Sequence, residues 1–191
     1  SQPAKTVKDL VALCKQNPGK ISFASAGGGS AQHLALEMFK LRAGIDALHV
    51  PYKGGGAAMT DLIAGNVHLL FASVLETSAH IKAGKLKALA IASKKRVSAL
   101  PDVPTLQELG ITGAESGSWL GLLAPSGTPA PIIEKISLSL QQVLAMPDVQ
   151  QQLLEQGAVA QGGTPADFVA LIAADRKKYA RIILDHRLSA D

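Results

Sequence analysis

The chain has 191 residues, 47% of them hydrophobic and 18% charged, a composition typical of a folded globular protein rather than a disordered one. Lys and Arg number 19 against 15 Asp and Glu, and no basic run is longer than Lys94–Lys95–Arg96, which disfavours a nucleic-acid-binding protein. The single cysteine, Cys14, excludes an internal disulfide and a cysteine-based metal site. No apolar run reaches the length of a membrane span, and no signal-peptide pattern opens the chain, so we interpret residues 1–4 as a cut edge.

The first 92 residues predict helices that alternate with strands. An apolar stripe over residues 7–14 indicates a helix, with Thr6 and Asp9 at capping-box spacing. Strands are expected over 21–24, 47–50, 67–71 and 86–92, with helices from Ser30 to Gly44 and over 57–64 and 75–83. Since these strands are apolar without polar alternation, both of their faces should be buried. The sequence therefore predicts an α/β fold with an open, mostly parallel, doubly wound sheet.

The second half of the chain has a different pattern. Residues 93–104 are polar, basic and proline-bearing, which indicates a surface excursion. A short helix is expected over 105–109 and a strand over 119–124, followed by helices over 132–143, 148–156 and from Thr164 onward. We expect this half to be mostly helical, with too few strands to cover its apolar helix surfaces.

Ligands of open parallel sheets bind beyond the carboxyl ends of the strands. The residues expected there are mainly hydroxyls, glycine amides and lysines, which suit an anion at helix N-termini better than acid–base catalysis. The Ser25–Ser30 loop carries the strongest signal, although a tight turn that binds nothing explains it equally well. The Tyr52–Gly56 loop repeats the pattern, and a flexible turn is its alternative. His33 could approach the crevice, but a bond to its own loop is the simpler interpretation.

Motifs of several enzyme classes do not match. Gln32 stands where a dinucleotide fingerprint needs its third glycine, and no glycine–lysine–hydroxyl triplet follows the loop. Ser25 lacks the first glycine of a nucleophile elbow, and no two histidines have metal-ligand spacing. Trp119 is interpreted as a packing residue, and Glu76 and Asp61 as solvated helix caps. We predict no catalytic residue, no metal and no cofactor.

Several segments, in order along the chain, resemble the Bug family, the TctC-like periplasmic solute-binding proteins of tripartite tricarboxylate transporters. They are 25–33, 49–55, 60–67, 81–90, 100–105, 119–129 and 163–165. No single segment is diagnostic, but the ordered set is specific. The resemblance implies a two-lobed Venus-flytrap receptor of the type II periplasmic-binding-protein class, which is not an enzyme. Such a protein captures a small di- or tricarboxylate, or a related organic acid, and delivers it to the membrane subunits of the transporter.

The resemblance also implies boundaries and a site. Residues 1–117 would form lobe 2, and 118–191 the returning segment of a lobe 1 whose N-terminal part is absent. Ser73 stands where the family often has an Asp that can receive an ammonium group, which favours a plain organic acid. The expected ligand-binding residues are Ser25, Gly27, Gly28, Gly29, Ser30, His33, Tyr52, Lys53, Gly54, Gly55 and Ser73.

Two alternatives remain open from the sequence. One is a Rossmann-like enzyme, or a domain that binds a nucleotide or a phosphorylated substrate. The other is a chain that binds nothing tightly and forms a homo-oligomer through the exposed helices of the incomplete lobe.

Overall fold

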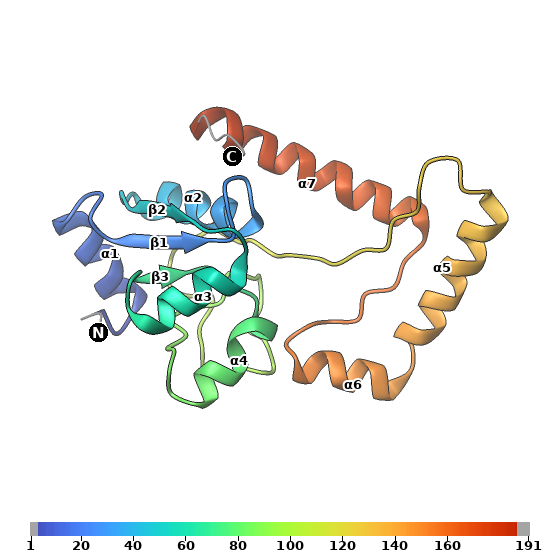
Figure 1. Ribbon diagram of the computed structural model, residues 1–191, viewed down its shortest axis with the longest axis horizontal. Helices are drawn as coiled ribbons and strands as arrows, with labels where there is room; N and C mark the ends of the chain where they lie inside the picture. Colours follow the sequence, from blue (N-terminus) through green and yellow to red (C-terminus); the bar gives the residue numbers. More distant parts are fainter. Residues whose placement is uncertain (1–3, 187–191) are drawn as a thin grey trace.

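A three-stranded parallel sheet organises the N-terminal part of the computed structural model, which describes residues 4–186 (Figure 1). The central strand β1 (Ser22–Ser25) pairs with β2 (Leu48–Pro51) on one side and with β3 (Leu69–Leu70) on the other, in the order β2-β1-β3. Helices α2 (Ala31–Ala43) and α3 (Gly55–Ala64) connect these strands and lie on opposite faces of the sheet. The α/β, doubly wound class is therefore confirmed, and the loops that follow the three parallel strands meet at one edge.

The predicted helix ends are confirmed for the first two helices. In α1 (Val7–Gln16), the Thr6 hydroxyl accepts from the Asp9 amide, and the Asp9 carboxylate accepts from the Thr6 amide at 2.9 Å. Ser30 caps α2 in the same way, through the amide of His33. Gly44 then ends α2 in the left-handed conformation, with φ of 60°.

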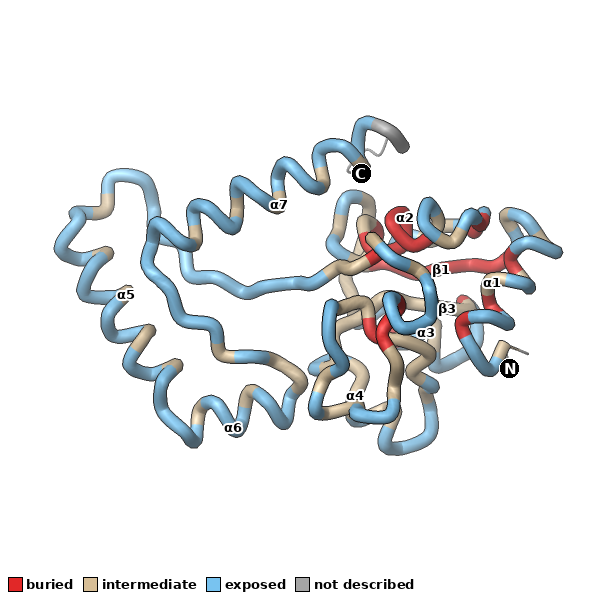
Figure 2. Tube along the Cα trace, turned by 180° about the vertical axis from the view of Figure 1, so that it is seen from behind, coloured by how far each residue is buried: buried red, intermediate tan, exposed pale blue. Residues whose placement is uncertain are grey.

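The hydrophobic core lies between α1, α2 and the sheet, where the buried residues gather in Figure 2. Leu36 and Cys14 are fully buried there, and Phe23 of β1 packs its ring 6.3 Å from that of Phe39 of α2. Phe71, just past β3, stacks on Phe23 and meets Phe39 edge-on. Three of the four phenylalanines of the sequence thus pack together between α2 and the sheet.

Two predicted strands and one predicted helix are not formed. Within the described residues, the segment 86–92 makes only a single parallel bridge, between Ile91 and Thr105. The segment that contains Thr105 turns directly after this residue, so the pairing does not continue. Residues 105–109 form turns rather than a helix. Residues 119–124 are extended without a strand partner, and Leu120 among them is 99% exposed. An apolar run predicts an extended segment, but a strand also needs a neighbour to bond with.

The C-terminal part carries three helices away from the sheet: α5 (Ala130–Leu144), α6 (Pro147–Glu155) and α7 (Pro165–His186). The predicted cap of α7 is present, since Thr164 and Asp167 exchange backbone-to-side-chain bonds of 2.8 and 3.2 Å. α7 runs back to contact α2, and Trp119 donates to Asp175 of α7 at 2.7 Å. The division at residue 117 stays a prediction.

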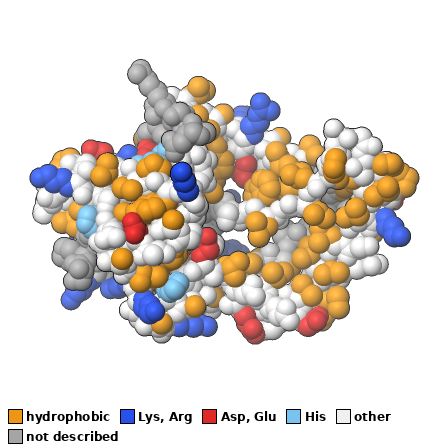
Figure 3. Space-filling view, in the orientation of Figure 1, with side chains coloured by type: hydrophobic (Ala, Val, Ile, Leu, Met, Phe, Trp, Pro, Cys, Tyr) orange, Lys and Arg blue, Asp and Glu red, His pale blue; other side chains and the backbone are white. Residues whose placement is uncertain are grey.

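Apolar side chains of this C-terminal part are left on the surface (Figure 3). No described residue after Ala114 is buried. Leu122 and Val159 are 65% and 77% exposed, and α5 exposes much of its apolar face. None of the helices between residues 4 and 186 combines the length and the apolar character that crossing a bilayer requires. Residues 1–3 of the expected cut edge lie outside the described residues.

Candidate ligand-binding site

The two glycine loops lie against each other at the carboxyl edge of the sheet. The amide of Tyr52 donates to the Ser25 carbonyl, and the amide of Gly54 donates to the Ala26 carbonyl, both at 3.0 Å. Gly27 has a φ of 135°, and a Cβ atom there would lie 3.2 Å from the Tyr52 carbonyl oxygen. Only glycine allows both this backbone conformation and this close approach. The loops after β1 and β2 therefore form one continuous rim.

Ser25 supports its own loop from below. The side chain is fully buried, and its Oγ atom lies 2.7 Å from Nε2 of His49 in β2. The same oxygen bonds the amide and the carbonyl of Gly27, at 3.1 and 3.0 Å. The hydroxyl is thus engaged with the protein on three sides, which makes Ser25 a support of the rim. Its contact with a ligand stays a prediction.

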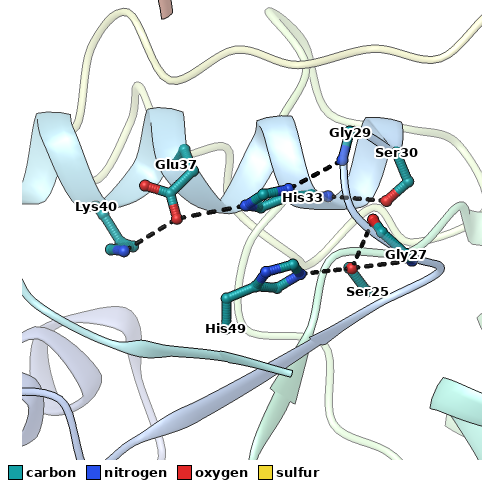
Figure 4. Close-up of polar contacts among 8 residues, drawn as sticks. All are labelled: Ser25, Gly27, Gly29, Ser30, His33, Glu37, Lys40 and His49. Atoms are coloured by element: carbon teal, nitrogen blue, oxygen red, sulfur yellow. Dashed lines mark hydrogen bonds and ion pairs between the residues drawn. The ribbon is translucent and has the colours of Figure 1, made fainter. Parts of the chain in front are cut away.

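His33 holds the other end of the same loop (Figure 4). Its Nδ1 atom accepts from the Gly29 amide at 3.1 Å, and its ring stacks on that of His49, with centroids 3.7 Å apart and planes inclined by 9°. The Nε2 atom faces Glu37 at 3.8 Å, and Glu37 also bonds Lys40 at 2.9 Å. His33 is 7% exposed, so the structure favours the simpler sequence interpretation, a bond to its own loop.

The main-chain donors of the two loops differ in how far they are engaged. In the first loop the amides of Gly27, Gly29 and Ser30 bond acceptors within the loop or its helix. In the second loop, α3 begins after Gly54, which has no side chain to cap it. The first amides of a helix have no acceptor within the helix and carry the positive end of its dipole. The start of α3 is therefore the part of the rim best suited to a carboxylate.

Tyr52 is fixed by an acid that the sequence interpretation treated as a solvated cap. Its hydroxyl donates to Asp61 at 2.6 Å, and Asn66 donates to the other carboxylate oxygen at 3.1 Å. These two bonds lower the pKa of Asp61, and the bond to Asp61 raises the pKa of Tyr52. Tyr52 is thereby tied to α3, while Lys53 beside it is exposed.

The loop after β3 places an acid at the rim. Ser73 caps α4 (Val74–Lys82), and its amide and hydroxyl both donate to Oε2 of Glu76, at 3.0 and 2.9 Å. Oε1 of Glu76 lies 3.0 Å from the position that a Cβ atom would take at Gly55, and Nε2 of Gln32 lies 3.5 Å from it. The sequence analysis interpreted Glu76, near the carboxyl end of the third strand, as a solvated cap, and it did not include Gln32 or Glu76 among the expected ligand-binding residues. The capping-box spacing of Ser73 and Glu76 predicts the contact between them.

The described residues bring together no three His, Cys, Asp or Glu side chains that could hold a metal ion. The geometry is thus that of a rim of glycine loops, helix N-termini and a few fixed side chains, on a parallel α/β sheet. These features are typical of proteins that bind a small polar ligand at the edge of a parallel sheet.

Comparison with known proteins identifies the family. The sequence matches the family described as TctC, tripartite tricarboxylate transporter family receptor, over residues 1–188, and the chain belongs to this family. It is 36% identical, over 98% of its length, to the UPF0065 protein in the tcbD-tcbE intergenic region of Pseudomonas sp. (strain P51). It covers 56% of that relative, so the chain spans about half of its length. The UPF0065 protein in the clcB-clcD intergenic region of Pseudomonas knackmussii is 35% identical, over 87% of this chain and 99% of its own.

Solved structures agree with this assignment. R. palustris Rpa4515 with adipate has a TM-score of 0.94 and 30% identity, covering 99% of this chain and 63% of its own. Periplasmic binding protein BugD has a TM-score of 0.88 and 37% identity, covering 97% and 62%. MatC from Rhodopseudomonas palustris with bound malate has a TM-score of 0.81 and 29% identity, covering 94% and 61%. The predicted Bug/TctC resemblance is confirmed, and a family of receptors agrees with the expectation that this protein is not an enzyme.

Proposed function

We propose that this chain forms the ligand-binding part of a periplasmic receptor that captures a small organic acid for a tripartite transporter. The observation that carries the proposal is the joined rim, in which the glycine loops after β1 and β2 are bonded through Gly54 and Ala26 beside the open N-terminus of α3. Two similar proteins have been solved with the dicarboxylic acids adipate and malate, which supports a carboxylate as the ligand class.

The chemistry of the rim supports binding without conversion. A carboxylate placed at the start of α3 accepts from its first amides and lies at the positive end of the helix dipole. Charge-assisted bonds of this kind are roughly twice as strong as those between neutral groups. Lys53, exposed in the same loop, adds positive charge near the rim. The histidines His33 and His49 are engaged under the loop, where they stabilise its shape.

We further propose that residues 118–191 belong to lobe 1 of the receptor, as the segment of the chain that returns to it. α7 contacts α2, and the segment before α5 is fastened to α7 where Lys178 donates to the Glu115 carbonyl at 2.7 Å. In the proposed receptor, membrane subunits of the transporter receive the ligand. A homo-oligomer that buries the exposed leucines of this half is the alternative use of the same surface.

Isothermal titration calorimetry of the full chain tests the ligand class. The carboxylates in the panel are succinate, malate, adipate and citrate. NAD, ATP and inorganic phosphate are titrated separately, as representatives of the nucleotide and phosphate ligands of the alternative. We expect heat of binding with at least one carboxylate and none with NAD or ATP. Binding of a nucleotide together with no response to any carboxylate would show the Rossmann-like alternative to be right.

A further inference from the structure

His33 is a buried titratable residue to which the proposed function gives no direct contact with the ligand. Its Nδ1 atom accepts from the Gly29 amide at 3.1 Å, so this nitrogen carries a lone pair and the proton of the neutral ring is on Nε2. Nε2 faces Oε1 of Glu37 at 3.8 Å, and Glu37 is itself buried. One tautomer of the ring therefore suits both neighbours, the carboxylate on one side and the glycine loop on the other.

A second proton on this ring is incompatible with the bond to the loop. Protonated His33 is a donor at both nitrogens, so Nδ1 can no longer accept from the Gly29 amide. The amide would then point at another donor, and a buried N–H group without an acceptor costs free energy. Uptake of a proton by His33 and the observed shape of the glycine loop thus exclude each other.

The charged and titratable groups around the ring decide where a proton goes. Glu37 attracts a proton to His33, although Lys40 balances part of its charge through a contact of 2.9 Å. His49 of β2, whose ring centroid is 3.7 Å away, opposes a charge on both rings at once. The helix α7, which contacts α2, carries further charged residues, among them Asp175, Lys178 and Arg181. Because Glu37 faces His33, the first proton taken up by the stacked pair belongs to His33.

The loop that His33 holds is connected to the proposed carboxylate position. The Ala26 carbonyl of this loop accepts from the Gly54 amide at 3.0 Å, and α3 begins directly after Gly54. When the Gly29 amide loses its acceptor, the segment that positions the start of α3 is therefore held less firmly. The effect on a ligand is indirect, through the main chain of both loops.

We propose that His33 makes ligand capture depend on pH. With a single ring proton, on Nε2, it holds the first glycine loop in place, and a second proton, on Nδ1, releases the loop and weakens binding. This inference rests on the proposed function and makes His33 a positioning residue, which acts through Gly29. Since the binding form has the neutral ring, the affinity is complete at a pH above the titration of the ring and decreases as the pH falls through it. Imidazole side chains ordinarily titrate near about pH 6.5.

Calorimetry of the full chain with malate and with adipate, at pH 8 and at pH 5, tests the dependence. The decisive variant is His33→Asn, because its Oδ1 atom can accept from the Gly29 amide but takes up no proton in this range. Between the two pH values, the parent chain should lose about tenfold more affinity than His33→Asn. Titration of the acids themselves affects both chains alike, so it cancels in this comparison. An equal loss of affinity in the two chains overturns the inference.

A second variant and a matched control locate the effect. Glu37→Gln removes the carboxylate that attracts the proton, so the decrease in affinity should move to lower pH, and a midpoint that stays or rises contradicts the proposal. The control is His68→Asn, since His68 Nδ1 also accepts from a backbone amide, that of Ser22, at 2.9 Å. Ser22 begins β1, at the end of the strand away from the rim, so this control should retain the pH profile of the parent chain. Circular dichroism of each variant at both pH values shows that the fold is retained.

Hydrogen exchange of the Gly29 amide tests the release of the loop without any ligand. Its protection, corrected for the intrinsic pH dependence of exchange, should fall about tenfold from pH 8 to pH 5 in the parent chain and stay constant in His33→Asn. Constant protection in the parent chain overturns the inference, and carboxylate binding then stands or falls by its own titration. If neither acid binds at either pH, the proposed function fails, and the exchange experiment alone decides whether His33 releases the loop.

Discussion

The rings of His33 and His49 lie parallel and in contact, 3.7 Å apart, beneath the glycine loop that joins β1 to α2 (Figure 4). One ring comes from α2 and the other from β2, and each bonds a different end of the loop, Gly29 through His33 and Ser25 through His49. The stacked pair therefore fixes the main chain of the glycine loop relative to the edge of the sheet. This support gives both histidines a structural role on the inner side of the site.

Replacing His33 tests this support. His33→Phe preserves an aromatic ring for stacking but leaves the Gly29 amide without its acceptor, so we expect a loss of about 1–3 kcal/mol in the free energy of unfolding. Urea denaturation followed by circular dichroism measures the change. His33→Asn is the matched variant, because its Oδ1 atom can replace Nδ1 as the acceptor. Equal stability of His33→Phe and the parent chain would show that the bond to Gly29 contributes nothing.

Gly27 should be intolerant of any side chain. Gly27→Ala places a Cβ atom 3.2 Å from the Tyr52 carbonyl at a φ of 135°, which L-residues rarely adopt. We expect a loss of about 1–3 kcal/mol in the free energy of unfolding, together with loss of ligand binding. Gly56→Ala is the control, since no atom lies within 4 Å of its Cβ position and Gly56 is within α3. It should be neutral or stabilise the chain by about 1 kcal/mol.

Tyr52→Phe should loosen the second loop without unfolding the core. The substitution removes the donor to Asp61, whose pKa should then rise toward its ordinary value because its strongest hydrogen bond is lost. NMR titration of the Asp61 carboxyl measures this rise, and a melting curve should show a small decrease in Tm. An unchanged Asp61 titration would contradict the hydrogen bond.

Acid should weaken the turn at residues 105–110. The Arg96 guanidinium and the amide of Thr105 lower the pKa of Glu108 from 4.5 to about 2. Because the folded pKa lies below the unfolded one, the charged form stabilises the fold above about pH 4.5, and this contribution is lost as the pH falls toward 2. The parent chain should therefore lose more Tm between pH 6 and pH 2.5 than Glu108→Gln does. Equal losses would show that Glu108 does not titrate with folding.

The core gives a reference for these smaller effects. Leu36 is fully buried, so Leu36→Ala should lower the free energy of unfolding by about 2–5 kcal/mol. Leu41, on the same helix, is 50% exposed, and Leu41→Ala should cost much less. Denaturant titration of both variants checks the ranking. Similar losses would mean that the apolar face of α2 is assigned incorrectly.

Local patterns in the sequence were sufficient for the first two helices and their ends, but they wrongly predicted a helix over 105–109, where the chain forms turns. The Thr6–Asp9 box, the cap at Ser30 and the left-handed Gly44 all depend on residues within one turn of each other, and all are present. The same reasoning failed for 86–92 and 119–124, because an apolar run specifies an extended chain but not the strand that bonds to it.

The sequence by itself determined the α/β class, the position of the two glycine loops and the family. Only the tertiary structure decided which amides of those loops are already bonded, that His33 stacks on His49, and that Gln32 and Glu76 both approach Gly55. The physical reason is the range of the interactions. A cap or a turn is decided by neighbours along the chain, whereas the unpaired groups of a binding site are those left over after segments far apart in sequence have packed together.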